Sequence, residues 1–159
     1  MADTYFLLEY PIYRHFDADD VDILSKICTE EKFKAGADVF AEGSAGDAMY
    51  IIKSGSVKVL KSSDKGKKLG IILSPGEFFG EMALIDGSER SATVRADEET
   101  QVVRLSVEGY NRLKAEFAST GFKVVDVLLK FMSQRIRRTT TKAAELAKAG
   151  KRRKAGGKK

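Results

Sequence analysis

The pattern of hydrophobic and polar residues changes along the chain, and each change predicts a different kind of element. After Asp17, apolar side chains recur at Val21, Leu24 and Ile27, a spacing that predicts a short helix capped by Asp17. Between residues 33 and 106, short apolar runs alternate with turn signals, which is typical of strands. The predicted strands are 39–40, 49–52, 57–60, 69–73, 78–79, 92–94 and 101–105. Their short spacing predicts a sandwich or a barrel.

Glycine-containing turns separate these runs. The segments 43–47, 64–66 and 74–76 each place a glycine where a tight turn can require a positive φ. Pro75 fixes its own φ and so favours the third turn. We therefore expect hairpins at these points.

Two further helices are predicted after the strands. Ser106 can cap the first of them, in which Tyr110 and Leu113 lie on one face. Gly121 precedes a longer helix that ends at about Ala149. The predicted order is therefore helix, strands, helix and long helix.

The long helix carries a stripe of apolar and small residues whose separations alternate between four and three. Its members are Val125, Leu129, Met132, Ile136, Thr139, Ala143 and Leu146. This repeat is typical of a coiled-coil seam and favours a homodimer formed through the helix. The same stripe is also compatible with a helix that packs on its own domain. Thr139 and Ala143 contribute little to such a core, so both interpretations stay open.

Charge divides the chain unevenly. The 159 residues carry a net charge of +5 and are 43% hydrophobic, enough for one core. Residues 135–159 hold 11 basic and one acidic residue, leaving 17 basic and 22 acidic residues before them. We expect a domain over 1–149 and a flexible basic tail over 150–159, because the tail has too few apolar groups to order itself. No aromatic residue follows Phe131, so nucleic-acid binding by the tail would be weak and independent of sequence.

Composition argues against several classes of function. Cys28 is the only cysteine, so an intramolecular disulfide is impossible. We expect its side chain to be buried and to pack as a small hydrophobic group. His15 is the only histidine, so we expect neither a metal site nor a histidine-based triad. The chain has no basic start and no run of eighteen apolar residues. We therefore expect a cytoplasmic protein that is not an enzyme, holds no cofactor and does not insert into a membrane.

The segment 78–96, FFGEMALIDGSERSATVRA, carries the candidate chemistry. Gly80 allows a ligand to approach the backbone, and the residues after it can form a helical turn whose N–H groups face an anion. Arg90 can donate to two phosphate oxygens at once, and Ser91 can add a hydroxyl donor. Glu81 can instead accept a hydrogen bond from a sugar hydroxyl. The segment predicts a site for a ribose phosphate, with a surface ion pair beside a turn as the alternative.

This segment closely resembles the phosphate-binding cassette of the cyclic-nucleotide-binding domain family, which includes catabolite-activator-type regulators and the regulatory subunits of cAMP-dependent protein kinase. The resemblance covers residues 11 to about 140. It includes the stretches PIYRHFDADDVDILSKI, GADVFAEGSAGDAMYIIKSGSVKV and LSPGEFFGEMALI. It implies a mainly β fold with flanking helices, namely a double-stranded β-helix (jelly-roll) barrel with an N-terminal helical piece and C-terminal helices, the last one long.

The resemblance also implies which residues bind the ligand. The candidates are Gly80, Glu81, Met82, Ala83, Arg90, Ser91, Thr139 and Thr140. Glu81 would bind the ribose 2′-hydroxyl and Arg90 the cyclic phosphate, with the amides of the intervening turn on the remaining oxygens. Thr139 and Thr140 match the region that contacts adenine in catabolite-activator-type proteins. Ser91 is compatible with cAMP and with cGMP, and we favour cAMP.

Two functional hypotheses follow. In the first, the chain is a regulatory module in which cyclic-nucleotide binding moves the C-terminal helix, and a protein partner or second copy responds. The residues after Leu146 are too few for the helix-turn-helix domain of catabolite-activator-type regulators. In the alternative, the chain is a nucleic-acid-associated protein that binds through its basic tail and uses the barrel as a scaffold.

Overall fold

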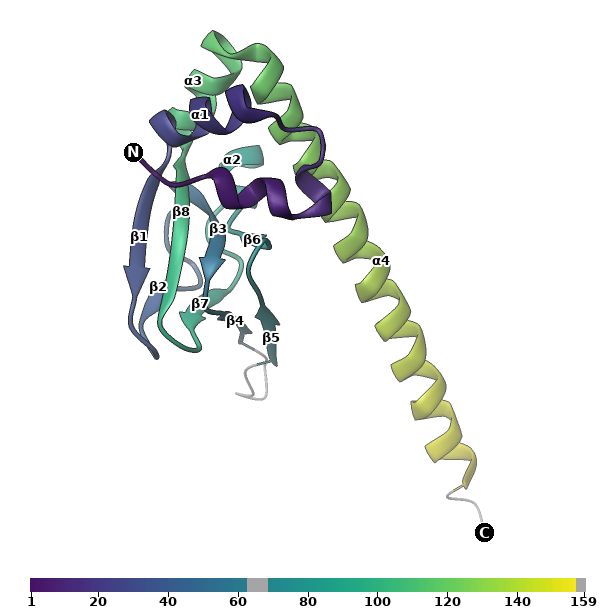
Figure 1. Cartoon of the computed structure of the whole chain (residues 1–159). Helices are drawn as coiled ribbons and strands as arrows, with labels where there is room; N and C mark the ends of the chain where they lie inside the picture. Colours follow the sequence, from purple (N-terminus) through teal and green to yellow (C-terminus); the bar gives the residue numbers. More distant parts are fainter. Residues whose placement is uncertain (63–68, 157–159) are drawn as a thin grey trace. The chain divides into compact units, whose positions relative to one another are not determined.

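Residues 1–62 and 69–156 are described by a computed structural model of the chain, shown in Figure 1. The chain divides into two compact units, Met1–Lys123 and Val124–Lys159. The first unit contains the N-terminal helices, the strands and the beginning of the last helix. The predicted turn at 64–66 lies outside the described residues.

The first unit begins with helical segments. They are η1 (Tyr5–Glu9), η2 (Pro11–Tyr13) and α1 (Ala18–Ile27). Asp17 caps α1, because its Oδ1 accepts a hydrogen bond from the backbone N of Asp20 at 3.0 Å. Oδ2 of Asp20 accepts in return from the backbone N of Asp17 at 3.0 Å. This reciprocal capping box satisfies two backbone donors at the helix start and confirms the capped helix that the sequence predicts.

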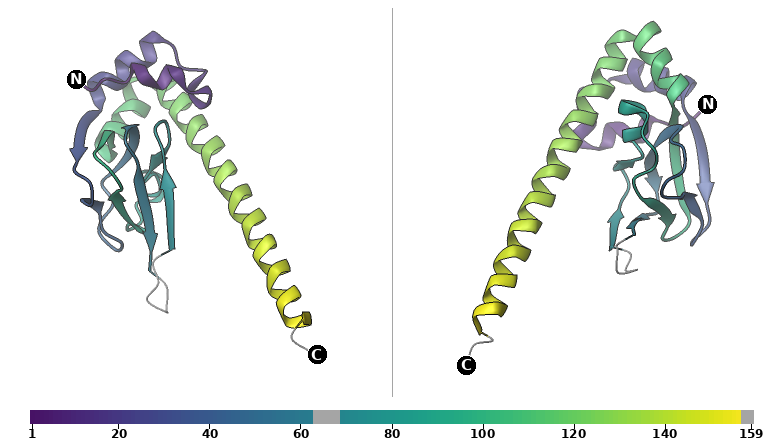
Figure 2. Two further views of the ribbon diagram at one scale, coloured as in Figure 1. Left: turned by 60° about the horizontal axis from the view of Figure 1, so that its bottom comes forward. Right: turned by 180° about the vertical axis from the view of Figure 1, so that it is seen from behind.

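Eight strands occur among the described residues and pair as two four-stranded antiparallel sheets (Figure 1). One sheet has the order β1–β8–β3–β6 and the other β2–β7–β4–β5. The strands are β1 (Thr29–Phe33), β2 (Asp38–Phe40), β3 (Ala48–Ser54), β4 (Val57–Lys61), β5 (Leu69–Leu73), β6 (Phe78–Phe79), β7 (Thr93–Ala96) and β8 (Thr100–Ser106). Because both sheets mix early and late strands, the chain crosses repeatedly between them, and the predicted jelly-roll barrel is confirmed. Figure 2 shows this barrel from two further sides, with α1 at one end of the strands.

The core contains side chains from strands of both sheets. Strand β3 contributes alternate residues to it, as a pleated strand requires. The buried members are Ala48, Tyr50, Ile52, Val57, Leu73, Phe79, Val94 and Val102, with Phe33, Val39, Phe40 and Val59 packed against them. This packing fixes β3 and β6, and β6 forms the beginning of the segment 78–96.

The sequence analysis missed strand β1, whose sequence TEEKF is mostly polar. Thr29 pairs with Arg104 of β8, and Phe33 pairs with Thr100. The strand lies at the edge of its sheet, so most of its side chains face solvent. Backbone pairing holds most of it in place, with Phe33 as its only apolar side chain, and a search for apolar runs therefore overlooks it.

Two helices follow β8, namely α3 (Val107–Glu116) and α4 (Ala118–Gly156). Ser106 caps α3 as predicted, because its Oγ accepts a hydrogen bond from the backbone N of Gly109 at 3.0 Å. Within the described residues, no helix combines the length and apolar character needed to cross a membrane.

Helix α4 extends beyond the predicted helix at both ends. It begins at Ala118, so Gly121 lies inside it, and it continues past Ala149 to Gly156. The tail predicted as flexible over 150–159 is therefore helical through Gly156. Lysine, arginine and alanine are good helix formers, so the helix continues through Gly150 at the cost of one unfavourable residue. The division into a domain over 1–149 and a separate tail stays a prediction.

A buried polar cluster joins α1 to the first turns of α4 within the first unit. Asp20 is only 3% exposed, and its Oδ1 accepts a hydrogen bond from Oγ1 of Thr120 at 2.7 Å. Nζ of Lys123 lies 2.5 Å from Oδ2 of Asp20 and 3.2 Å from Oδ2 of Asp17. Residues 100 or more positions apart are therefore linked through one carboxylate.

Candidate functional site

The segment 78–96 turns sharply at Gly80, between β6 and the short helix α2 (Met82–Asp86). Gly80 has a φ of +76°, a conformation that favours glycine. A Cβ at this position would lie 2.6 Å from Nη1 of Arg90 and 3.2 Å from the carbonyl oxygen of Ala48. Glycine therefore allows the Arg90 guanidinium to lie directly against the turn.

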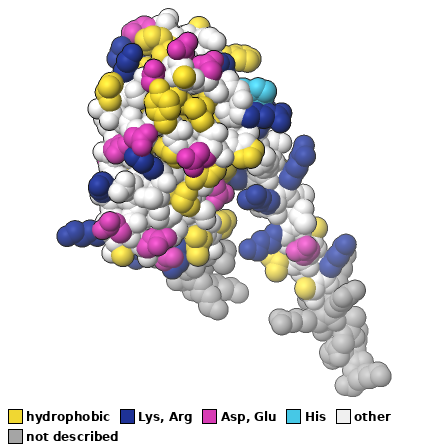
Figure 3. All heavy atoms as spheres, viewed as in Figure 1, with side chains coloured by type: hydrophobic (Ala, Val, Ile, Leu, Met, Phe, Trp, Pro, Cys, Tyr) yellow, Lys and Arg dark blue, Asp and Glu magenta, His cyan; other side chains and the backbone are white. Residues whose placement is uncertain are grey.

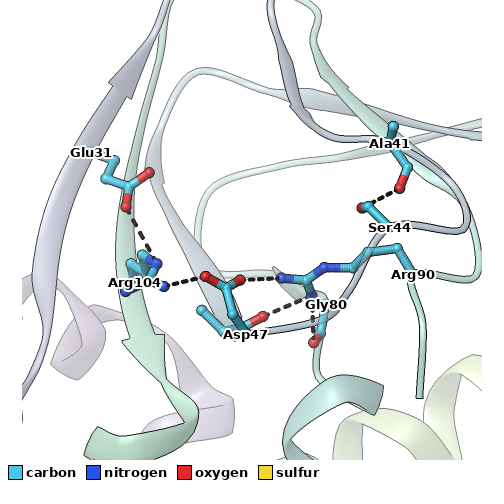
Figure 4. Close-up of polar contacts among 8 residues, drawn as sticks. Glu31, Ala41, Ser44, Asp47, Gly80, Arg90 and Arg104 are labelled. Atoms are coloured by element: carbon cyan, nitrogen blue, oxygen red, sulfur yellow. Dashed lines mark hydrogen bonds and ion pairs between the residues drawn. The ribbon is translucent and has the colours of Figure 1, made fainter. Parts of the chain in front are cut away.

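Arg90 is the central charged group of the site and is only 5% exposed. Its Nη1 donates to the carbonyl oxygens of Ala48 (2.8 Å) and Gly80 (3.1 Å), and its Nη2 donates to Oδ1 of Asp47 at 3.1 Å (Figure 4). Within the described part of the chain, Nε of Arg90 is buried without a hydrogen-bond partner. The guanidinium is thus fixed in position, and one of its donors is buried without a partner.

Aromatic rings of the core lie beneath this guanidinium. Cζ of Arg90 is 4.0 Å from the ring centroid of Phe40 and 5.8 Å from that of Tyr50. The Tyr50 and Phe79 rings are stacked with centroids 5.3 Å apart, and Phe40 contacts both. A guanidinium over an aromatic face is stabilised by the ring quadrupole, so these rings favour the charged side chain at a buried position.

Asp47 connects Arg90 to the outer edge of the sheet. Its Oδ2 accepts from Nη2 of Arg104 at 2.6 Å, and Arg104 in turn lies 3.4 Å from Oε1 of Glu31 (Figure 4). Burial raises the pKa of Asp47, but the hydrogen bond from Arg104 and the charges of Arg104 and Arg90 outweigh it and lower the pKa below its ordinary value. Asp47 therefore stays ionised and orients both guanidinium groups.

The loop after β2 supports Arg90 through the backbone. The backbone N of Gly43 donates to the carbonyl oxygen of Arg90 at 2.8 Å, and the backbone N of Arg90 donates to the carbonyl oxygen of Ser44 at 2.8 Å. A Cβ at Gly46 would lie 2.3 Å from Cβ of Ala83, so glycine also permits close contact between this loop and α2. Two loops far apart in sequence thus pack tightly around the candidate site.

The other predicted residues near Gly80 occupy different environments. Glu81 is buried at 6% exposure and stands at the N-cap of α2, and Ala83 is also buried. Met82 and Ser91 are exposed. The structure thus brings Gly80, Ala83 and Arg90 into one compact region, and the binding roles of all of them stay predictions.

Thr139 and Thr140 lie on α4 in the second unit. Both are exposed, and Oγ1 of Thr140 donates to the carbonyl oxygen of Ile136 at 2.9 Å. This bond to the preceding helical turn is a common use of a threonine hydroxyl in a helix. Their assignment to the nucleotide base stays a prediction.

Sequence reasoning missed Asp47, Arg104 and Phe40 as parts of this region. The sequence pattern places Asp47 in a predicted turn, and Arg104 and Phe40 in predicted strands. Asp47 is 43 positions from Arg90 and 57 from Arg104, so no local pattern connects them. Only strand pairing brings them together.

Cys28 is buried, as the sequence predicts, and burial raises the pKa of its thiol to about 12. The thiol therefore stays protonated and is a poor nucleophile. Among the residues that the structure describes, no group of three His, Cys, Asp or Glu side chains is arranged to hold a metal ion.

The family model of the cyclic nucleotide-binding domain matches residues 30–117 of the chain. The chain belongs to the cyclic nucleotide-binding domain family. The matched region includes Gly80, Glu81 and Arg90, so the segment that resembles the phosphate-binding cassette lies within the family's own domain. The resemblance inferred from the sequence is confirmed.

Curated relatives of this domain include regulatory proteins. The chain is 35% identical over 108 residues to a cAMP-dependent protein kinase regulatory subunit of Yarrowia lipolytica, covering 68% of this chain and 28% of that protein. It is 33% identical over 101 residues to a cyclic AMP receptor protein of Thermus thermophilus, covering 63% and 47% respectively. The chain thus spans less than half the length of either relative.

Solved structures of the family share the fold. A cyclic nucleotide-binding domain from Methylobacillus flagellatus matches with a TM-score of 0.81 and 28% identity, covering 89% of this chain and 83% of that one. The catabolite activator protein of Thermus thermophilus matches with a TM-score of 0.75 and 28% identity, covering 87% and 63%.

Proposed function

We propose that this domain binds a cyclic nucleoside monophosphate at residues 80–91 and acts as a ligand-responsive regulatory module through movement of α4. The observation that carries the proposal is the buried guanidinium of Arg90, which is fixed by Asp47 and two carbonyl oxygens. Its buried Nε is an additional donor for an anion. A singly charged cyclic phosphate matches one arginine, and a planar guanidinium can bind two of its oxygens.

The remaining groups of the turn have complementary roles in this proposal. The backbone amides of Met82 and Ala83, in the first turn of α2, donate to phosphate oxygens. Glu81 accepts a hydrogen bond from the ribose 2′-hydroxyl, and Arg90 offsets its negative charge. In this proposal Thr139 and Thr140 contact the nucleotide base.

We expect cAMP to bind more tightly than cGMP. The relatives named above are described as a cAMP-dependent kinase subunit and a cyclic AMP receptor, and a similar regulatory domain from Toxoplasma gondii, 28% identical with a TM-score of 0.68, was solved with cAMP. Isothermal titration of the chain with each nucleotide tests this proposal. Equal or tighter cGMP binding would refute the preference, and binding of neither nucleotide would refute the site.

Replacing Glu81 by alanine should reduce discrimination between cAMP and 2′-deoxy-cAMP. A hydrogen bond to a buried carboxylate contributes about 1.5 to 3 kcal/mol, so the wild type should prefer cAMP by about 10-fold or more. The variant should bind the two nucleotides almost equally, as measured by competition titration. Glu89, an exposed carboxylate in the same segment, provides the control, since Glu89→Ala should keep the preference. A wild type that ignores the 2′-hydroxyl would contradict the role of Glu81.

We also propose that α4 forms a homodimer through the alternating seam defined above. Its large members Leu129, Ile136 and Leu146 are 62%, 64% and 65% exposed, although they are apolar. Lys and Arg side chains are spread along the same helix (Figure 3), which would keep an isolated helix in solution. Burial of the seam between two copies would remove this apolar surface from water.

Replacing Ile136 by aspartate should dissociate this dimer without unfolding the barrel, because it would place an unpaired charge at the centre of the seam. Light scattering at high micromolar concentration measures the change in mass. Gln134→Asp introduces the same charge on the same helix away from the seam and should leave the dimer intact. A monomeric wild type would contradict the proposal.

The proposed movement of α4 can be measured separately from nucleotide affinity. Hydrogen exchange of α4 amides, followed with and without cAMP, should change when the nucleotide binds, because ligand binding shifts the balance between helix positions. Unchanged exchange along α4 would contradict the regulatory part of the proposal. The cytoplasmic location and the role of the basic residues after Gly150 stay predictions.

A further inference from the structure

A second charged group contacts the backbone beside Arg90. Lys61 is the last residue of β4, and its Nζ donates to the carbonyl oxygen of Ser91 at 2.7 Å and to Oε1 of Glu42 at 2.5 Å. Ser91 directly follows Arg90 in the chain. Lys61 therefore links the backbone of Ser91 to the carboxylate of Glu42, which comes from a different loop.

Glu42 is itself held by neighbouring groups. Its Oε2 accepts a hydrogen bond from the backbone N of Ser62 at 3.1 Å, and its own backbone N donates to Oγ1 of Thr93 at 3.0 Å. The hydrogen bonds from Lys61 and Ser62 lower the pKa of Glu42 below its ordinary value. Glu42 therefore stays ionised at neutral pH and keeps Lys61 in place.

The loop that carries Glu42 also forms hydrogen bonds with the backbone of Arg90. Gly43 and Ser44 pair with both backbone groups of Arg90 at 2.8 Å. Residues 42–44 thus fix Arg90 directly and fix Ser91 through Lys61. The backbone from which the Arg90 side chain and the Ser91 hydroxyl extend is therefore held on both sides.

The exposure of the ion pair argues for a positioning role rather than a large role in stability. The Lys61 side chain is 57% exposed and that of Glu42 is 27% exposed. Ion pairs at such positions contribute little to folding because water and salt screen them. A binding site, in contrast, is sensitive to small displacements of the groups that contact the ligand.

We propose that Lys61 and Glu42 form a clamp that positions the Arg90–Ser91 segment for the nucleotide phosphate, so that Lys61 is a positioning residue for nucleotide affinity. This inference rests on the proposed function. Lys61 acts through the carbonyl oxygen of Ser91 and has no assigned contact with the ligand. Asp47 fixes the guanidinium end of Arg90, whereas the clamp fixes its backbone end.

Lys61→Met tests the clamp by removing the donor while keeping a side chain of similar length. We expect its Kd for cAMP to rise about 5- to 10-fold, with the melting temperature without ligand nearly unchanged. Lys61→Arg should restore affinity to within about 2-fold, because a guanidinium can donate to both oxygens. Lys58→Met is the matched control, since Lys58 lies on the same strand and pairs with Asp97 instead. Equal effects of Lys58→Met and Lys61→Met would overturn the proposal.

Glu42→Gln separates a clamp from a simple effect of charge. If Lys61 only attracted the phosphate as a nearby cation, removing the negative charge of Glu42 would lower the Kd. If Glu42 holds Lys61 on the Ser91 carbonyl oxygen, the Kd should instead rise about 2- to 3-fold. A fall in Kd, or no change, would overturn the clamp. If wild-type protein binds no cyclic nucleotide, the proposed function fails, whereas normal wild-type binding with an unaffected Lys61→Met variant refutes only the clamp.

Discussion

Replacing Arg90 by alanine should remove most of the affinity for cAMP, a loss of about 2 to 4 kcal/mol or about 30- to 1,000-fold in Kd. The phosphate would enter a partly buried turn and lose its only charge-assisted donor there. The variant would also lose the guanidinium that contacts the carbonyl oxygens of Ala48 and Gly80. Isothermal titration with cAMP measures the affinity directly.

Two further variants keep this prediction testable if Arg90→Ala is unstable. Arg90→Lys retains the charge but not the planar fork, so it should fold and bind with an intermediate affinity. Arg95→Ala removes a half-exposed arginine that pairs with Asp38 on the neighbouring strand, and it should bind cAMP as the wild type does. Wild-type affinity in Arg90→Lys and Arg90→Ala together would refute the phosphate site.

Replacing Asp20 by alanine should lower the free energy of unfolding by about 2 to 3 kcal/mol. The change removes half of the capping box of α1 and the acceptor of the buried Thr120 hydroxyl. It also takes away the closer of the two carboxylates on Lys123. Urea denaturation followed by circular dichroism measures the loss.

The same cluster supplies the controls for this second prediction. Asp19→Ala changes an exposed carboxylate in the same helical turn and should alter stability by less than about 0.5 kcal/mol. Thr120→Val should cost little more in the Asp20→Ala background, since its acceptor is already gone. If Asp20→Ala unfolds at the same urea concentration as the wild type, the cluster contributes nothing to the stability of the fold.

The local elements of this protein were predictable because their signals are short in sequence. Asp17 and Ser106 cap helices by binding backbone groups three residues away, so a few neighbouring residues suffice to identify them. The turn at Gly80 and the return of the chain to Arg90 span ten positions, and the order of residue types within that span indicates a phosphate site. The alternation of apolar runs and turns likewise indicated a barrel.

The surroundings of Arg90 were decided by the tertiary structure alone. Its acceptors Ala48 and Asp47 are 42 and 43 positions away, and the ring of Phe40 is farther still. Which residues meet across a sheet depends on the register of strand pairing, and register is a property of the whole barrel rather than of any segment.

Strand β1 and helix α4 are two elements whose extent the local sequence pattern did not predict. The polar segment 29–33 becomes a strand because β8 offers it backbone partners, although its own pattern indicates none. Helix α4 passes through Gly121 and Gly150, where local signals favoured a boundary. The sequence alone determined where the segment around Gly80 turns and which helix starts are capped, and it predicts a phosphate site in that segment. Only the folded barrel decided which distant carboxylates, rings and carbonyl oxygens surround Arg90, because those contacts depend on long-range pairing that no short pattern encodes.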